Sequence, residues 1–172
     1  KVGIVENNVQ CDVASDKDIR DKFNIIKRNF DRYEKGFLEK INLRYVVLCQ
    51  NLRVSNIKTA GVPNHNVKTL IVDIKSDERF FERSLHHELF HMVDDSYDSL
   101  FSDEKWSQLN NPNFKYAKCS TCSNRLDLKL YKDTKGFLTE YSMSTASEDM
   151  AEIFSFLMID KTKVSKILLK DP

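Results

Sequence analysis

Two histidines spaced four residues apart are the side chains of this sequence best suited to chemistry. They belong to the run H-E-L-F-H at residues 87–91, an H-E-x-x-H pattern. On a helix, residues i and i+4 share a face with about 5 to 6 Å between their Cβ atoms, so His87 and His91 can both reach one zinc ion at about 2.0 to 2.1 Å. Glu88 is turned by about 100° around the helix and can take a proton from a water molecule beside the metal. The pattern predicts a catalytic zinc site with Glu88 as the general base.

The alternative is a chance match on a charged helix. Chance produces this pattern somewhere in such a chain on the order of 1% of the time or less. The surrounding sequence also provides the required context, because apolar residues recur at helical spacing at Phe81, Leu85, Leu89 and Met92. This period predicts a helix from about residue 77 to residue 95, which holds the motif in its second half.

A catalytic zinc usually has three protein ligands and keeps its fourth position for water. His65 stands alone in a segment rich in Gly, Pro and Asn, where an exposed polar histidine is the ordinary interpretation. His86 points away from the face of the other two imidazoles, which favours the surface or a place beside a ligand. Glu148 is the better candidate, since it shares a predicted helical face with Glu152, largely opposite an apolar stripe. A solvated acidic first turn, favoured by the helix dipole, is the alternative for Glu148.

Three segments of the sequence together resemble a known family. They are L-H-H-E-L-F-H-M-V-D-D at residues 85–95, F-L-T-E-Y at residues 137–141 and E-D-M-A-E-I-F at residues 148–154. The set resembles the catalytic domain of the anthrax toxin lethal factor. It is similar more widely to bacterial zinc-binding metallopeptidases of gluzincin-like type, which pair H-E-x-x-H with a downstream E-x-x-A-E helix. The stretch from Trp106 to Tyr116 also resembles those bacterial proteins. The resemblance covers about residues 85 to 158.

The resemblance implies a role for each matching residue. His87 and His91 match the first two ligands of one zinc ion, and Glu148 matches the third ligand. Glu88 matches the general base, as its place beside the metal already indicates. The main departure is a longer spacer between His91 and Glu148 than the toxin family has, which affects the expected substrate cleft and leaves the expected metal site unchanged.

Two further residues acquire roles through the resemblance alone. Glu152 matches a carboxylate that orients a ligand imidazole, a partner that metal-bound histidines usually have. Tyr141, in the L-T-x-Y segment seven residues before Glu148, matches a tyrosine whose hydroxyl stabilises the oxyanion. Ordinary core packing is the alternative for Tyr141.

Hydrophobic periodicity predicts one α+β domain over residues 1–172. The resemblance implies a zincin-like fold, with the H-E-x-x-H helix packed on a small sheet and a downstream helix that carries Glu148. Predicted strands lie at residues 2–5, 45–49 and 70–74, with a turn-rich loop at 60–66. Predicted helices lie at 16–35, 77–95 and 103–109, from 147 onward, and at 163–170. By analogy with zinc peptidases, the strand at 70–74 is expected to present its edge to an extended peptide.

Composition narrows the partners. The net charge is +1, with 27 basic and 26 acidic residues, and this balance argues against a nucleic-acid binder. No run approaches the ~18 to 20 apolar residues of a membrane span, so a soluble chain is expected. For the C-x-x-C pair Cys119 and Cys122, free thiols are favoured over a disulfide or a second metal site.

These observations predict a zinc-dependent endopeptidase that hydrolyses a protein substrate. The toxin-like resemblance further implies a bacterial effector protease, secreted or translocated into a host cell and acting on a host protein. Two alternatives remain at this stage: a catalytically degenerate zinc-binding interaction module, and a zinc hydrolase of non-peptide substrates. Intact Glu88 argues against the degenerate module, because a site without turnover needs no base beside the metal.

Overall fold

The computed structural model describes residues 8–97, 99–130 and 136–170. The chain divides into two compact units, Lys1–Ser96 and Tyr97–Pro172, and each is considered by itself. Helices and a mixed sheet confirm the α+β class, while the expectation of one catalytic domain over residues 1–172 stays a prediction. The predicted strand at residues 2–5 lies outside the described residues. Within the described ranges, no helix is both long enough and apolar enough to cross a membrane.

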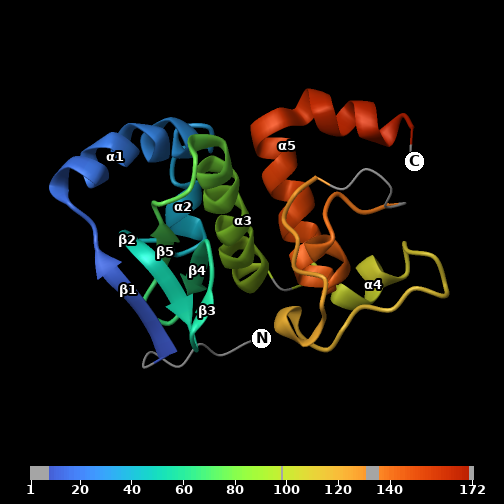
Figure 1. The fold of residues 1–172 in the computed structure, drawn as a ribbon. Coiled ribbons are helices and arrows are strands. Elements are labelled where there is room, and N and C mark those ends of the chain that lie inside the picture. Colours follow the sequence, from blue (N-terminus) through green and yellow to red (C-terminus); the bar gives the residue numbers. More distant parts are fainter. Residues whose placement is uncertain (1–7, 98, 131–135, 171–172) are drawn as a thin grey trace. The chain divides into compact units, whose positions relative to one another are not determined.

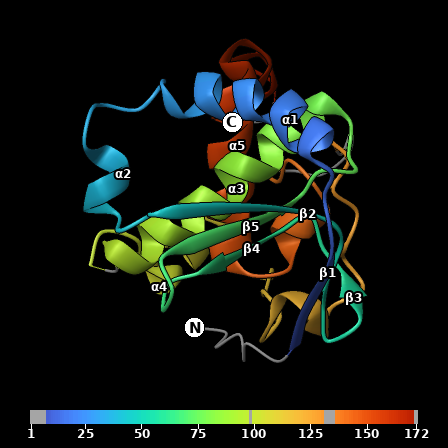
Figure 2. The same ribbon diagram turned by 90° about the vertical axis from the view of Figure 1, so that its left-hand side faces the viewer.

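The first unit contains a five-stranded sheet (Figure 1). Its strands are β1 (Val9–Val13), β2 (Tyr45–Val54), β3 (Ile57–Lys58), β4 (Gly61–Asn64) and β5 (Thr69–Asp73). The order is β1-β2-β5-β4, with β3 paired to β2, and β2, β5 and β4 run side by side in Figure 2. Only β2 and β5 are parallel; the other pairs are antiparallel.

This order corrects two expectations about the sheet. β5 has a neighbour on each side, so the strand at residues 70–74 does not offer a free edge. Among the described residues, the outer strand on the far side of β5 from β2 is β4, where the sequence predicted a loop. Gly61 and Pro63 give the segment a turn-like composition, but Gly61 pairs with Val72 and Pro63 pairs with Leu70. Proline is tolerated in an outer strand because its missing N–H need not pair.

The first helix of this unit, α1 (Asp16–Phe30), starts where predicted and ends earlier. The Ser15 hydroxyl accepts a hydrogen bond from the Asp18 N–H at 3.2 Å, which caps the helix. Along this helix the apolar side chains are not all buried, since Phe23 is 60% exposed while Ile25 and the polar Asn29 are buried. A short helix, α2 (Phe37–Lys40), follows it.

The helix that carries the H-E-x-x-H motif, α3 (Glu78–Ser96), has the predicted position and face. The Asp77 carboxylate accepts a hydrogen bond from the Phe80 N–H at 3.0 Å and caps its start. Phe81, Leu85 and Leu89 are all fully buried, and α3 packs against β4, β5 and α1. The apolar period therefore identifies both the helix and the side that faces the sheet.

The second unit is mostly helical at its C-terminal end. It contains α4 (Asp103–Ser107), the short 3-10 helices η2 (Ser120–Cys122) and η3 (Tyr141–Met143), and α5 (Ala146–Leu168). Asp160 has non-helical backbone angles within α5, and its carboxylate accepts from the Lys163 N–H at 3.0 Å. The separately predicted helix at 163–170 therefore corresponds to the part of α5 after this kink. Leu138, Phe156 and Val164 form a small buried cluster.

All four cysteines form disulfides, which corrects the free-thiol interpretation. Cys11 pairs with Cys49, and Cys119 pairs with Cys122. The first bond depends on β1, a strand that the sequence did not predict and that lies beside β2. In the C-x-x-C segment, the 3-10 turn brings the two Cα atoms to 5.1 Å, within the usual range for a disulfide. Both thiols of this pair are thereby used, so the alternative of a second metal site there is also wrong.

Candidate metal centre

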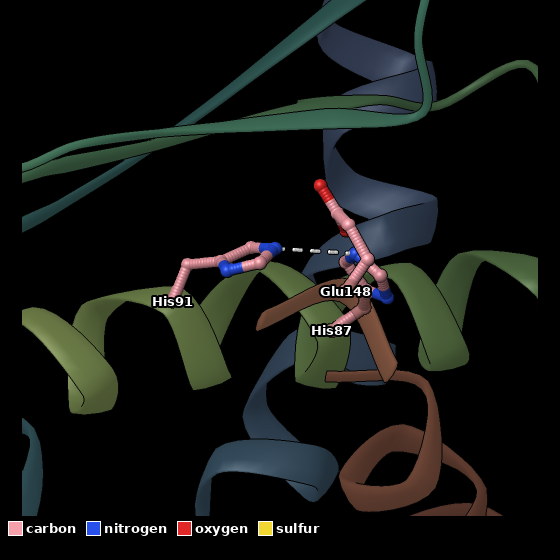
Figure 3. Close-up of side chains that lie close together, drawn as sticks. All are labelled: His87, His91 and Glu148. Atoms are coloured by element: carbon pink, nitrogen blue, oxygen red, sulfur yellow. Dashed lines mark hydrogen bonds between the residues drawn. The ribbon is translucent and has the colours of Figure 1, made fainter. Parts of the chain in front are cut away.

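The imidazoles of His87 and His91 project from α3 and meet at their outer nitrogens (Figure 3). The two Nε2 atoms are 3.3 Å apart, and the ring centroids are 5.0 Å apart with the planes at 75°. His87 is buried and His91 is half-buried. The helical spacing thus places two potential metal ligands side by side, as predicted.

Glu88, the predicted general base, is buried on the same helix with 8% of its surface exposed. Its side chain lies against Gly61 in β4. The fully buried side chains of Leu85 and Leu89 anchor α3 one turn before and one residue after this position. The Glu88 side chain therefore lies between the main chain of its own helix, α3, and strand β4.

His86 is not at the surface, which was one of its two expected places. It is fully buried, with Nδ1 at 2.6 Å from the Tyr33 hydroxyl and Nε2 at 3.0 Å from Asn29 Oδ1. The Asn29 amide nitrogen donates to the Ile25 carbonyl at 2.8 Å and to Glu82 at 2.9 Å. Asn29 therefore bonds α1 to α3 on the side of α3 that carries His86.

These contacts determine which nitrogen of His86 carries the proton. Asn29 Oδ1 can only accept, so Nε2 of His86 must be the N–H donor. Nδ1 then accepts from the Tyr33 hydroxyl. Burial lowers the pKa of His86 to about 4, assisted by Arg32 and opposed by Glu82. The imidazole next to His87 in sequence is thus neutral at pH 7 and has a single tautomer.

His65, the competitor of Glu148 for the third ligand position, lies in the turn after β4. Its Nδ1 is 3.3 Å from a carboxylate oxygen of Asp95 near the end of α3, and both side chains are about one-third exposed. Asp95 was given no role from the sequence. The pair connects the β4–β5 turn to α3 and agrees with the interpretation of His65 as a partly exposed polar residue.

In the second unit, the candidate residues Tyr141 and Glu148 lie in consecutive elements. Tyr141 opens η3, and its N–H donates to the Asp127 carbonyl at 3.1 Å. Glu148 lies in the first turn of α5, where its N–H donates to the Thr145 hydroxyl at 3.2 Å. This cap fixes where α5 begins, and η3 packs against α5. The predicted order, a tyrosine just ahead of the glutamate helix, is confirmed.

Glu152 links the two downstream motifs directly. It is 1% exposed, and its carboxylate accepts from the hydroxyl of the fully buried Thr139 at 2.8 Å. Thr139 also accepts from the Ser142 N–H at 3.0 Å. The face of α5 that was predicted to be polar is therefore interior at Glu152. The bond between Thr139 and Glu152 thus joins the L-T-x-Y segment to the E-x-x-A-E helix.

Asp149 forms a second buried cluster, which the sequence did not predict. One carboxylate oxygen accepts from the Trp106 indole N–H at 2.8 Å and from the Tyr116 hydroxyl at 2.7 Å. Asn110 donates in turn to the Tyr116 hydroxyl at 2.9 Å. Burial raises the pKa of Asp149 to about 6, against the effect of the Trp106 and Tyr116 donors. The segment from Trp106 to Tyr116 thus fixes the first turn of α5, and its resemblance to the bacterial proteins was the only signal for it.

The family of the chain follows from a comparison with protein-family models. The model described as "Putative zinc-binding metallo-peptidase" matches residues 50–171. The chain belongs to this family. No curated protein and no solved structure matches it. The matched residues include every candidate site residue, and the match supports a zinc metallopeptidase. It does not support the more specific resemblance to the toxin catalytic domain.

The family is described as zinc-binding, so the spacing of the two imidazoles on α3 can be compared with the spacing of two zinc ligands. Two nitrogen ligands at about 2.0 to 2.1 Å from one tetrahedral zinc ion stand about 3.3 Å apart. The Nε2 atoms of His87 and His91 are separated by 3.3 Å. The pair therefore has the spacing of two ligands of a single tetrahedral ion before any side chain moves.

Proposed function

We propose that this chain is a zinc-dependent endopeptidase that hydrolyses a protein substrate. In this proposal His87, His91 and Glu148 hold one zinc ion, and each residue offers one ligand atom to it (Figure 3). The observation that carries the proposal is the 3.3 Å separation of the two Nε2 atoms on α3, because this spacing fits one tetrahedral ion. The family match to a zinc-binding metallopeptidase supports it.

The same proposal gives the other residues their chemical tasks. Bound zinc supplies a Lewis acid that polarises a carbonyl group and makes water more acidic. Glu88 takes the proton of the attacking water on its carboxylate and later delivers it to the leaving amine. The Tyr141 hydroxyl donates a hydrogen bond to the oxyanion that forms on the scissile carbonyl. Glu152, held by Thr139, orients a ligand imidazole through the ring nitrogen that does not face the metal.

The two disulfides support an oxidising working compartment. Structural disulfides persist in secreted proteins and are rare in the reducing cytosol, and all four cysteines of this chain are paired. We therefore place the enzyme outside the cytosol of the cell that makes it. Action on a host protein, as the toxin-like resemblance implies, belongs to the same proposal. Secretion into an oxidising space fits the disulfides better than delivery into a host cytosol.

The proposal is tested by identifying new N-termini in a mixed peptide library after incubation with the zinc-loaded protein. Glu88→Gln is the matched control, because it keeps the shape of the side chain and removes its basicity. Internal cleavage by the wild type and a loss of at least about 10²-fold in Glu88→Gln, within the range of general-base contributions, support an endopeptidase. Cleavage of esters without peptides would instead favour a non-peptide hydrolase, and zinc binding without turnover would favour an interaction module.

A further inference from the structure

We propose that Gly61 of β4 is a positioning residue for Glu88, because its missing side chain leaves the space that Glu88 occupies. A Cβ atom at position 61 would lie 2.4 Å from Glu88 Cγ, 2.9 Å from Cδ and 3.0 Å from Oε1. A non-bonded carbon pair has its optimal separation at about 3.5 to 4.0 Å. Any other residue at position 61 would therefore displace the glutamate from its place. This inference rests on the proposed role of Glu88 as the base.

The backbone of Gly61 does not explain why glycine is needed there. Gly36 and Gly136 have φ angles of 82°, in the left-handed region that favours glycine, whereas Gly61 is not among the residues with positive φ. It lies within β4 and pairs with Val72 of β5. An alanine could adopt this strand conformation without strain, so the requirement for glycine comes from Glu88.

The strand has little freedom to move away from a larger side chain. β4 is bonded to β5 along its length, and the Ala60 carbonyl just before it accepts from the Asp73 N–H at 2.9 Å. The Gly61 carbonyl also accepts from the Thr59 hydroxyl at 3.0 Å. Movement of β4 would therefore disturb several hydrogen bonds at once.

The helix on the other side is equally fixed. Leu85 and Leu89, which flank Glu88 on α3, are fully buried, and close-packed interiors resist displacement. With both main chains held, the Glu88 side chain must rotate when a Cβ is added. A shift of about 1 Å in a catalytic group can cost about 10²-fold in rate. Gly61 thus sets where the carboxylate stands relative to the imidazoles of α3.

The kinetic test compares Gly61→Ala with the wild type on one synthetic peptide, chosen from those that the wild type cleaves in the library. We expect kcat to fall by about 10²-fold, with KM within about twofold and zinc content unchanged. Val62→Ala is the matched control, because Val62 is the next residue of β4, is 2% exposed and packs with Cys49 and Leu52. It should lower the melting temperature and keep kcat. Wild-type kcat in Gly61→Ala, with Glu88→Gln inactive, would overturn the inference.

A second test examines the contact without relying on catalysis. Gly61→Ala is introduced into the wild type and into Glu88→Ala, which lacks the Cγ, Cδ and Oε1 atoms that a Cβ at position 61 would meet. We expect a lower melting temperature in the wild-type background and an unchanged or higher one in Glu88→Ala, where alanine only restricts the unfolded chain. Equal shifts in both backgrounds would refute the contact. Wild-type activity in Glu88→Gln would refute the proposed function and leave this stability test valid.

Discussion

The two disulfides should contribute very differently to the stability of the protein. Cys11 and Cys49 are 38 residues apart in sequence and connect β1 to β2, whereas Cys119 and Cys122 are 3 residues apart. A disulfide limits the freedom of the unfolded chain, and the effect grows with the logarithm of the loop that it closes. Reduction of the long-range bond should therefore cost more stability than reduction of the local one.

The chain-entropy relation gives the sizes of the two effects. With the sequence separations of 38 and 3 as loop lengths, it predicts about 3.9 kcal/mol for Cys11–Cys49 and about 1.6 kcal/mol for Cys119–Cys122 at 25 °C. The difference of about 2.3 kcal/mol corresponds to a factor of about 50 in the ratio of folded to unfolded protein.

The measurement uses two double variants, each of which keeps one disulfide. Cys119→Ala/Cys122→Ala retains only the bond between β1 and β2, and Cys11→Ala/Cys49→Ala retains only the bond in η2. Urea unfolding of each variant before and after reduction with dithiothreitol isolates one cross-link, because reduction removes no heavy atom. We expect the larger loss of unfolding free energy in the first variant. Equal losses, or titratable thiols in the native wild type, would refute the reasoning.

Three further predictions concern the proposed zinc site. Wild-type protein should retain one zinc per chain through gel filtration and His91→Ala should not, so equal zinc by elemental analysis would exclude the His91 ligand. In a chelator competition, Glu148→Ala should lose zinc affinity, and its activity should be lost as well. Glu152→Ala should lose only about 10- to 100-fold in zinc affinity or activity, and His65→Ala should change little. Loss of zinc in His65→Ala alone would reverse the ligand assignment. Tyr141→Phe should lower kcat by about 10²- to 10³-fold with zinc content and melting temperature unchanged, and activity within a few-fold of wild type would make Tyr141 a packing residue.

The sequence predicted best those elements whose side chains repeat along one face of a helix. α3 was located with its ends, its buried side and its paired imidazoles, because a period of 3.6 carries all of this information locally. The proposed base and both histidine ligands share that helix. The sequence also predicted that Tyr141 lies just before the helix that carries Glu148, although the roles of both residues came from resemblance to a family.

Features that depend on pairing between distant segments could not be predicted in the same way. β4 has the composition of a turn and becomes a strand only because β5 lies beside it. The Cys11–Cys49 bond requires β1, which carries no strong strand signal and gains its place through β2. Glu152 was expected on a polar face, yet Thr139 satisfies its carboxylate in the interior. In each case the partner lies elsewhere in the chain, so local propensity is overridden by tertiary contacts.

The hydrogen bonds of Asn29 have a consequence for which substitutions the protein can accept during evolution. One amide group donates to the Ile25 carbonyl and to Glu82 and accepts from His86. Aspartate would remove both donors and place a second carboxylate beside Glu82, and leucine would remove the acceptor of the buried His86 N–H. In a library of all single substitutions selected for activity, position 29 should therefore be among the least permissive, although it lies 58 residues before His87. For a variant at position 29 that loses activity, zinc content and melting temperature measured together would distinguish a displaced α3 from a loss of folding.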